Sequence, residues 1–152
     1  MKQIPTHPLP SMEEIEARLL ALGGEVQPSI ADTLDEFPVI NNFTPGLYSR
    51  TIFMPAGSVV VSRIHKTEHQ FVVSQGDCLV YSPNTGPVRI RAPYMGITKP
   101  GTHRVLVMLA DTIWTTFHAT DLTDLKELDE ALLEPVSAHP ALADAAKREI
   151  TQ

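Results

Sequence analysis

The twenty residues from Gly57 to Gly76, GSVVVSRIHKTEHQFVVSQG, indicate the fold of the whole chain. Two short apolar runs, VVVSRI and FVVS, flank a polar turn, which is the pattern of two strands joined by a tight reversal. His65 and His69 lie on either side of this turn. Imidazoles held on neighbouring rigid strands are good metal ligands, so the segment predicts half of a metal site.

The region around this segment shows the same alternation of short apolar runs and turn signals. From Phe37 to about Ala119, runs rich in valine, isoleucine, threonine and aromatic residues alternate with turn signals such as TPG, PAG, QGD and SPNTG. About eight strands spaced roughly ten residues apart predict an all-β sandwich or small barrel. The lack of an amphipathic segment of helical length between them argues against a parallel βαβ architecture. We therefore assign residues 37–119 to a β-barrel.

Helical patterns flank the barrel on both sides. Residues 1–36 read as an extended arm followed by a helix, MEEIEARLLALGG, for which Ser11 and Glu14 match the capping box. Residues 120–152 read as a helical tail. Within it, Asp121 is the expected cap of LTDLKELDEALL, whose leucines can pack on the sheet, and PALADAAKREI predicts a second short helix.

Composition limits the classes of function. The chain has 152 residues, of which 43% are hydrophobic and 20% charged, as expected for one globular domain. A net charge of −6 without a basic stripe argues against nucleic acid or an anionic membrane as a partner. The single cysteine, Cys78, lies in the apolar run CLVY, which predicts a buried thiol in a reducing compartment. Without a signal-peptide core or a run of membrane-spanning length, we expect a cytoplasmic protein.

Four of the six histidines, His65, His69, His103 and His118, lie in the predicted β-region. Alternation along the strands places each of them in phase with neighbours that include apolar residues, so each can point into a barrel. Taken singly, each is more simply explained as a core or edge histidine with a hydrogen-bond partner. For His65 and His69 together the metal interpretation is favoured, because the turn presents both imidazoles near one place.

The opening segment resembles the first motif of the cupin family. In that motif a glycine is followed after five residues by HxH, then by a glutamate after three or four residues, then by a second glycine after six more. Gly57, His65 and Gly76 fall at matching places, whereas Arg63 replaces the first histidine and His69 replaces the glutamate. The resemblance implies a double-stranded β-helix, also called a jelly-roll barrel. It also implies a homo-oligomer, because cupins commonly dimerise.

The second cupin motif, PxGxxHxxxN, is matched less closely by KPGTHRV. Arg104 stands at the ligand position, His103 lies one residue earlier, and Met108 stands where the asparagine belongs. These departures from the motif leave the family's usual set of metal ligands incomplete.

A narrower resemblance covers residues 37 to about 134. The phrases IHKTEHQFVVSQGD, APYMGITKPGTHRV and DTIWTTFHATDLTDLKELDE resemble small cupin-type proteins of tailed bacteriophages and prophages, most of which have no assigned activity. This resemblance implies His118 as the third metal ligand beside His65 and His69, with His103 as second choice. It also implies the host cytoplasm or the virion as the location, and a virion or host protein as a partner.

Three imidazoles would leave coordination positions open on a divalent ion such as Fe, Mn, Ni or Zn, as in catalytic sites. Because neutral imidazoles do not compensate the ion's charge, a small polar or anionic ligand is expected there. Arg63, in phase with His65, either fixes a substrate carboxylate or repels the metal, and the sequence leaves both open. Tyr48 and Trp114 are candidates for lining the pocket, although aromatic residues in strands usually belong to the core.

Three hypotheses follow for the function. The first is a metal-binding cupin that acts on a small polar substrate as an oxygenase, isomerase or lyase. The second is a non-catalytic structural or interaction module, for instance one associated with the virion or one that modulates a host protein. The third is binding of a sugar or nucleotide without chemistry. The fold alone does not choose among them.

Overall fold

The computed structural model describes residues 11–21, 25–27, 30, 36–82, 85–135 and 138. Its elements are, in chain order, α1 Met12–Ala21, β1 Glu25–Val26, β2 Val39–Thr44, β3 Leu47–Met54, β4 Val59–Val61, β5 His69–Gln75, β6 Asp77–Ser82, β7 Thr85–Arg91, β8 Tyr94–Thr98, β9 Val105–Met108, β10 Thr112–His118 and α2 Leu125–Leu132. The prediction of an all-β fold with a helix before the barrel and a helix after it is confirmed. The predicted second C-terminal helix, PALADAAKREI, lies outside the described residues.

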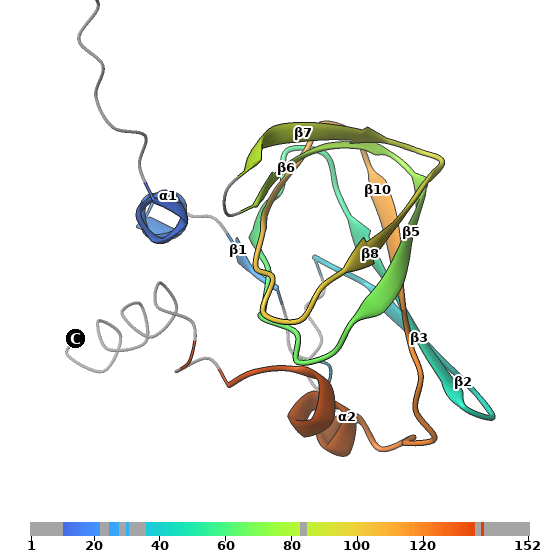
Figure 1. Ribbon diagram of the computed structural model, residues 1–152. Coiled ribbons are helices and arrows are strands. Elements are labelled where there is room, and N and C mark those ends of the chain that lie inside the picture. Colours follow the sequence, from blue (N-terminus) through green and yellow to red (C-terminus); the bar gives the residue numbers. More distant parts are fainter. Residues whose placement is uncertain are drawn as a thin grey trace, which may run out of the picture.

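The strands form two five-stranded sheets that enclose a common interior (Figure 1). One sheet has the order β2-β3-β10-β5-β8, and the other has the order β1-β4-β9-β6-β7. Every pair of described neighbouring strands is antiparallel except β1 with β4. Because strands that are consecutive in sequence often belong to different sheets, the chain passes repeatedly from one sheet to the other, as in a jelly roll.

Apolar side chains from both sheets fill most of the interior. Trp114 of β10 lies opposite Ile52 of β3 and Val73 of β5, and its ring stacks on Phe71 with 4.5 Å between centroids. Cys78 is buried, as predicted, and burial raises the pKa of its thiol to about 11, so it is not a nucleophile at neutral pH. We call this cluster the apolar half; its buried members are Phe37, Ile52, Met54, Val60, Phe71, Val73, Cys78, Val80, Ile90, Leu106, Met108 and Trp114.

The segment from β4 to β5 differs from its prediction. β4 and β5 belong to different sheets, so the expected hairpin is wrong and residues 62–68 form a crossover between the sheets. Its backbone is held by distant segments: the amide of Gly101 donates to the carbonyl of His65 at 2.9 Å, and Lys66 donates to Leu132 at 2.8 Å. Two apolar runs that flank a polar turn are compatible with a crossover as well as with a hairpin. The local pattern alone therefore could not distinguish the two.

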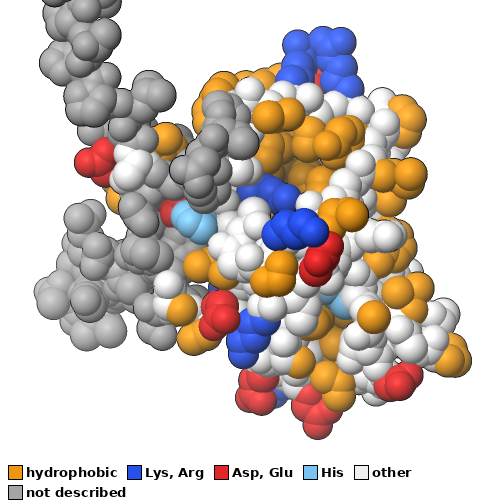
Figure 2. All heavy atoms as spheres, viewed as in Figure 1, with side chains coloured by type: hydrophobic (Ala, Val, Ile, Leu, Met, Phe, Trp, Pro, Cys, Tyr) orange, Lys and Arg blue, Asp and Glu red, His pale blue; other side chains and the backbone are white. Residues whose placement is uncertain are grey.

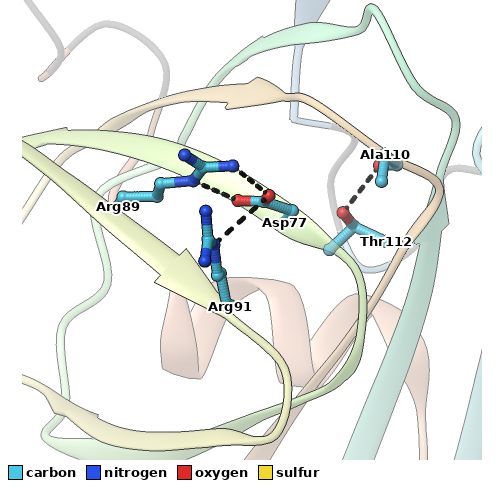
Figure 3. Close-up of polar contacts among 5 residues, drawn as sticks. All are labelled: Asp77, Arg89, Arg91, Ala110 and Thr112. Carbon is cyan, nitrogen blue, oxygen red and sulfur yellow. Dashed lines mark hydrogen bonds and ion pairs between the residues drawn. The ribbon is translucent and has the colours of Figure 1, made fainter.

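A second crossover joins β5 to β6 at Gly76. Gly76 has φ +116°, and a Cβ there would collide with the side chain and backbone of Thr112, so only glycine fits. The next residue, Asp77, accepts hydrogen bonds from Arg89, with Nε at 2.9 Å from Oδ1 and Nη2 at 2.6 Å from Oδ2 (Figure 3). Arg91 lies further from the same carboxylate, with its Nε at 3.7 Å.

The N-terminal helix begins as predicted. The amide of Ser11 donates to Oε2 of Glu14 at 3.0 Å, and the amide of Glu14 donates to Oγ of Ser11 at 3.2 Å, which is the reciprocal capping box. None of the helices in the described part of the chain is long and apolar enough to span a membrane.

The helix α2 lies across one end of the barrel (Figure 1), where Leu128 and Leu132 pack with the buried ring of Tyr48. Its cap is Asp124, whose Oδ1 accepts from the amides of residues 126 and 127 at 3.0 Å each. The prediction of Asp121 as the cap is therefore wrong. Asp121 instead accepts a hydrogen bond from the amide of Gly46 at 2.7 Å and ties the β2–β3 turn to this end of the chain.

Candidate metal centre

Three histidines from different segments of the chain meet in the interior of the barrel. One ligand nitrogen from each of His65, His69 and His118 lies within 4.8 Å of the other two. The ring centroids of His69 are 4.5 Å from those of both His65 and His118, and those two are 6.0 Å apart. All three side chains are buried. The structure thus brings together the three residues that the sequence singled out as ligands.

Three different backbone settings position these rings. His69 begins β5 and His118 ends β10, and each is in phase with interior neighbours, respectively Phe71 and Trp114, as predicted. His65 lies in the crossover, where its backbone forms an isolated antiparallel bridge with Leu133 at the end of α2. The phase expected for His65 from β4 does not apply, because the strand ends at residue 61 and alternation is lost beyond it.

Burial keeps the cluster neutral. Burial is the main cause that lowers the pKa of His65 to about 3 and that of His118 to about 3, with further lowering from neighbouring histidines and Arg50. The pKa of His69 is also lowered by burial, although its hydrogen bond to the Thr67 carbonyl acts in the opposite direction. At neutral pH all three rings are therefore in the deprotonated form that binds metal ions.

The hydrogen bonds around the cluster fit a metal ion. Nδ1 of His69 lies 3.1 Å from the carbonyl oxygen of Thr67 and must donate to it, which leaves Nε2 as an acceptor. Nε2 of His118 bonds to Oγ1 of Thr116 at 3.0 Å. Nδ1 of His118 is buried and has no hydrogen-bond partner among the described residues. A bound cation would satisfy this nitrogen, whose isolation otherwise costs about 1–3 kcal/mol.

A small cavity of about 50 Å³ adjoins the cluster. Both apolar and polar residues line it. Its lining residues are Gln27, Arg50, Ile52, Met54, Val60, Ser62, His65, His69, Thr98, Thr102, Arg104, Leu106, Trp114 and Thr116. Among the described lining residues, the two arginines are the charged ones, and none is a carboxylate.

The two cavity arginines differ in their contacts. Arg104 donates from Nη1 to Oγ1 of Thr98 at 2.8 Å, and its guanidinium lies 5.3 Å from the centroid of the Phe71 ring. Arg50 in β3 is only 5% exposed, and its Nε and Nη2 have no hydrogen-bond partner among the described residues. We call the three histidines with these two arginines the histidine end.

The arginines that line the cavity do not include Arg63, the one that the sequence indicated. The structure places Arg63 outside the cavity, where its Nη2 donates to the carbonyl of Glu134 at 2.9 Å. Sequence reasoning missed Arg50, although the alternation of LYSRTIFM places it in phase with Ile52 and Met54 and thus marks it as an inward-facing charge. Arg104 was noted at the ligand position of the second motif, but its role as a cavity residue was not foreseen.

The remaining candidates lie in different places. Trp114 lines the cavity, as considered from the sequence. Tyr48 is fully buried beside the cluster, with its ring 5.7 Å from that of His118 and its hydroxyl donating to Oδ1 of Asn41 at 2.5 Å, but it does not line the cavity. His103 is not part of the cluster, because its Nδ1 lies 2.6 Å from Oε1 of the buried Glu16 in α1.

A second hollow opens on the face of the barrel seen in Figure 2, edged by apolar side chains. Phe71, Tyr94 and Ile97 are among the residues that line it, and it shares Arg104 and Trp114 with the inner cavity. The hollow and the inner cavity therefore share part of their lining.

Comparison with known proteins supports the fold. No protein-family model matches the sequence, and no curated protein matches it. Among solved structures, salicylate 1,2-dioxygenase from Pseudoaminobacter salicylatoxidans is similar with a TM-score of 0.53 and 15% identity, over 78% of this chain and 32% of the dioxygenase. The protein VPA0057 of unknown function from Vibrio parahaemolyticus has a TM-score of 0.50 and 9% identity, over 57% of this chain and 92% of that one.

The cupin domain of Cnp3 from Schizosaccharomyces pombe is also similar, with a TM-score of 0.47 and 17% identity over 65% of this chain and 73% of that domain. The chain spans about a third of the length of the dioxygenase. At these identities the likeness concerns the fold. The fold is a jelly-roll barrel, as the resemblance to the first cupin motif implied, and its interior carries a three-histidine cluster that could hold a metal ion.

Proposed function

We propose that the protein is a metal-dependent cupin in which His65, His69 and His118 hold a divalent ion and a small molecule reacts beside it. The observation that carries this proposal is the convergence of three buried, neutral imidazoles within 4.8 Å, one of which has an unpartnered Nδ1. Buried polar atoms without partners are rare in native proteins, and a bound ion is one of the features that account for them.

In this proposal the neighbours of the histidines orient the ligands, and the ion supplies the chemistry. Thr67 and Thr116 hold His69 and His118 in fixed ring orientations, as outer partners of metal-binding histidines commonly do. When bound, an ion with three protein ligands and open positions supplies Lewis acidity. Imidazole suits Fe, Mn, Ni and Zn, so the chain's ligands are compatible with an oxygenase, an isomerase or a lyase.

The metal proposal is tested on protein purified without chelator. We expect about one divalent ion per chain by elemental analysis, and a rise in melting temperature when Fe, Mn, Ni or Zn is added to the chelator-treated protein. The variants His65→Gln and His118→Gln should lose both properties. His103→Gln is the matched control, because it removes an imidazole that lies outside the cluster, and it should retain both.

A wild-type protein that is free of metal and gains no thermal stability from any of the four ions would overturn the proposal. That result would favour a non-catalytic module, whose partner would then be a virion or host protein. The relationship to phage proteins and the homo-oligomeric state remain predictions from the sequence, and light scattering on the purified protein would measure the latter.

A further inference from the structure

We propose that the small molecule taken by this site is a carboxylate and that Arg50 anchors it through Nε and Nη2. This inference rests on the proposed function, because the anchored molecule would lie beside the ion held by the histidines. It adds the chemical class of the ligand and a residue whose importance no sequence motif marks.

The first support is the unpaired edge of a buried cation. Arg50 lines the cavity and is 5% exposed, yet its Nε and Nη2 have no hydrogen-bond partner among the described residues. Asp129 acts on Arg50 electrostatically, but the two form no ion pair, and Oδ1 of Asp129 accepts from the amide of Ile30 at 3.0 Å. A buried charge without a partner is strongly destabilising, so a bound anion is the natural complement of Arg50.

The second support is found elsewhere in the same protein. Arg89 uses the same two atoms, Nε and Nη2, to hold both carboxylate oxygens of Asp77 at 2.9 and 2.6 Å (Figure 3). This edge of a guanidinium matches a carboxylate with two parallel hydrogen bonds. The Nε and Nη2 edge that is unpaired in Arg50 is therefore the same edge with which Arg89 binds the carboxylate of Asp77 on the barrel surface.

The third support is the charge and size of the cavity. Arg50 and Arg104 make it positive, and a divalent ion would add to this charge, whereas none of the described residues that line it is a carboxylate. Arg104 already donates to Thr98, so its guanidinium is partly engaged. The cavity is small, at about 50 Å³, and apolar lining residues such as Ile52 and Leu106 suit a short carbon chain attached to the carboxylate.

The test uses propionate as the probe and propionamide as its neutral analogue, with binding to metal-loaded protein followed by calorimetry. We expect propionate to bind and propionamide not to bind. Arg50→Lys, which keeps a positive charge but loses the fork, should weaken propionate binding at least tenfold. The matched control is Arg91→Lys, because Arg91 is exposed on the barrel surface, and it should bind propionate as wild type does.

Two further measurements separate an anchor from a structural residue. Metal content should be unchanged in Arg50→Lys, so loss of propionate binding with metal retained supports the anchor. Arg50→Met should raise the melting temperature of the ligand-free protein, because it replaces an unpaired buried cation with an apolar side chain. A clear fall in that temperature would overturn the proposal and identify Arg50 as a structural residue.

The carboxylate assignment is overturned if propionamide binds as well as propionate, if Arg50→Lys binds propionate normally, or if inorganic phosphate binds and propionate does not. Failure of the metal proposal gives a different result. If the wild type holds no metal but binds propionate in a manner that depends on Arg50, the anchor stands and the metal centre does not.

Discussion

The apolar half and the histidine end are built from the same strands but satisfy their side chains differently. β10 supplies Trp114 to the first and His118 to the second, and β3 supplies Ile52 and Arg50 in the same way. Buried side chains in the apolar half pack on one another, whereas the histidine end keeps buried polar atoms without partners. One half of the barrel stabilises the fold, and the other half carries a cost in stability that a ligand would offset.

The largest effect of a single substitution is expected in the apolar half. Phe71→Ala should lower the free energy of unfolding by about 3–5 kcal/mol, because Phe71 is buried and its ring stacks on Trp114. Urea unfolding followed by circular dichroism measures this change. Met95→Ala is the control, since Met95 is 77% exposed and its loss should change stability by no more than about 0.5 kcal/mol. Equal effects for the two variants would contradict the role of Phe71 as a packed residue of the apolar half.

The next effect concerns the crossover that closes the apolar half. Gly76→Ala should cost about 2 kcal/mol or more, because the added Cβ collides with Thr112 in a left-handed backbone. Gly57→Ala is the matched control: Gly57 has φ +84°, but a Cβ there meets nothing within 4 Å. The difference in urea midpoint between the two variants isolates the collision from the backbone strain. A smaller loss for Gly76→Ala than for Gly57→Ala would contradict this account.

The features that could be predicted from the sequence are those that depend on local sequence patterns. The strands, the buried Cys78 and the capping box at Ser11 depend on local patterns, and the structure has them. The crossover after β4 did not follow from local pattern, because its backbone partners near Gly101 and Leu132 are distant in sequence. For the same reason His65 reaches the cluster without a strand to set its direction.

Charges in the candidate site were harder to place than histidines. Arg63 occupies the first histidine position of the motif and was considered because it is in phase with His65, but beyond β4 the strand alternation that would aim it inward is lost. Arg50 lies in a regular strand, where alternation does aim it inward. The overlooked signal in the sequence was an arginine in phase with the apolar residues of that strand. Whether an inward-facing arginine has a partner depends on tertiary contacts that no local pattern contains.

Acid should lower the stability of the metal-free protein through the histidine end. Burial lowers the folded-state pKa of His65 and His118 to about 3, whereas unfolded histidine titrates near 6.5. The unfolded chain therefore binds more protons below about pH 6.5, and stability falls as the pH decreases from there toward about 3, by up to ~1.4 kcal/mol per pH unit for each histidine.

Urea midpoints of chelator-treated protein at several pH values measure this slope. His118→Gln should make the slope shallower, because it removes one of the depressed groups, while Phe71→Ala should lower stability by a similar amount at each pH. A wild-type slope that is flat below pH 6, or one that His118→Gln leaves unchanged, would show that the cluster does not resist protonation.

The smallest effect is expected in the helix that covers the histidine end. Asp124→Ala should cost about 1 kcal/mol, because Asp124 accepts two amide hydrogen bonds at the start of α2. The end of this helix also bridges to the backbone of His65, so fraying of α2 should lower metal affinity as well as stability. Asp121→Ala, which removes a single hydrogen bond to the β2–β3 turn, should lower stability without changing metal affinity. Equal metal affinity in both variants would show that the cap of α2 does not support the histidine end, whose geometry would then depend on the sheets alone.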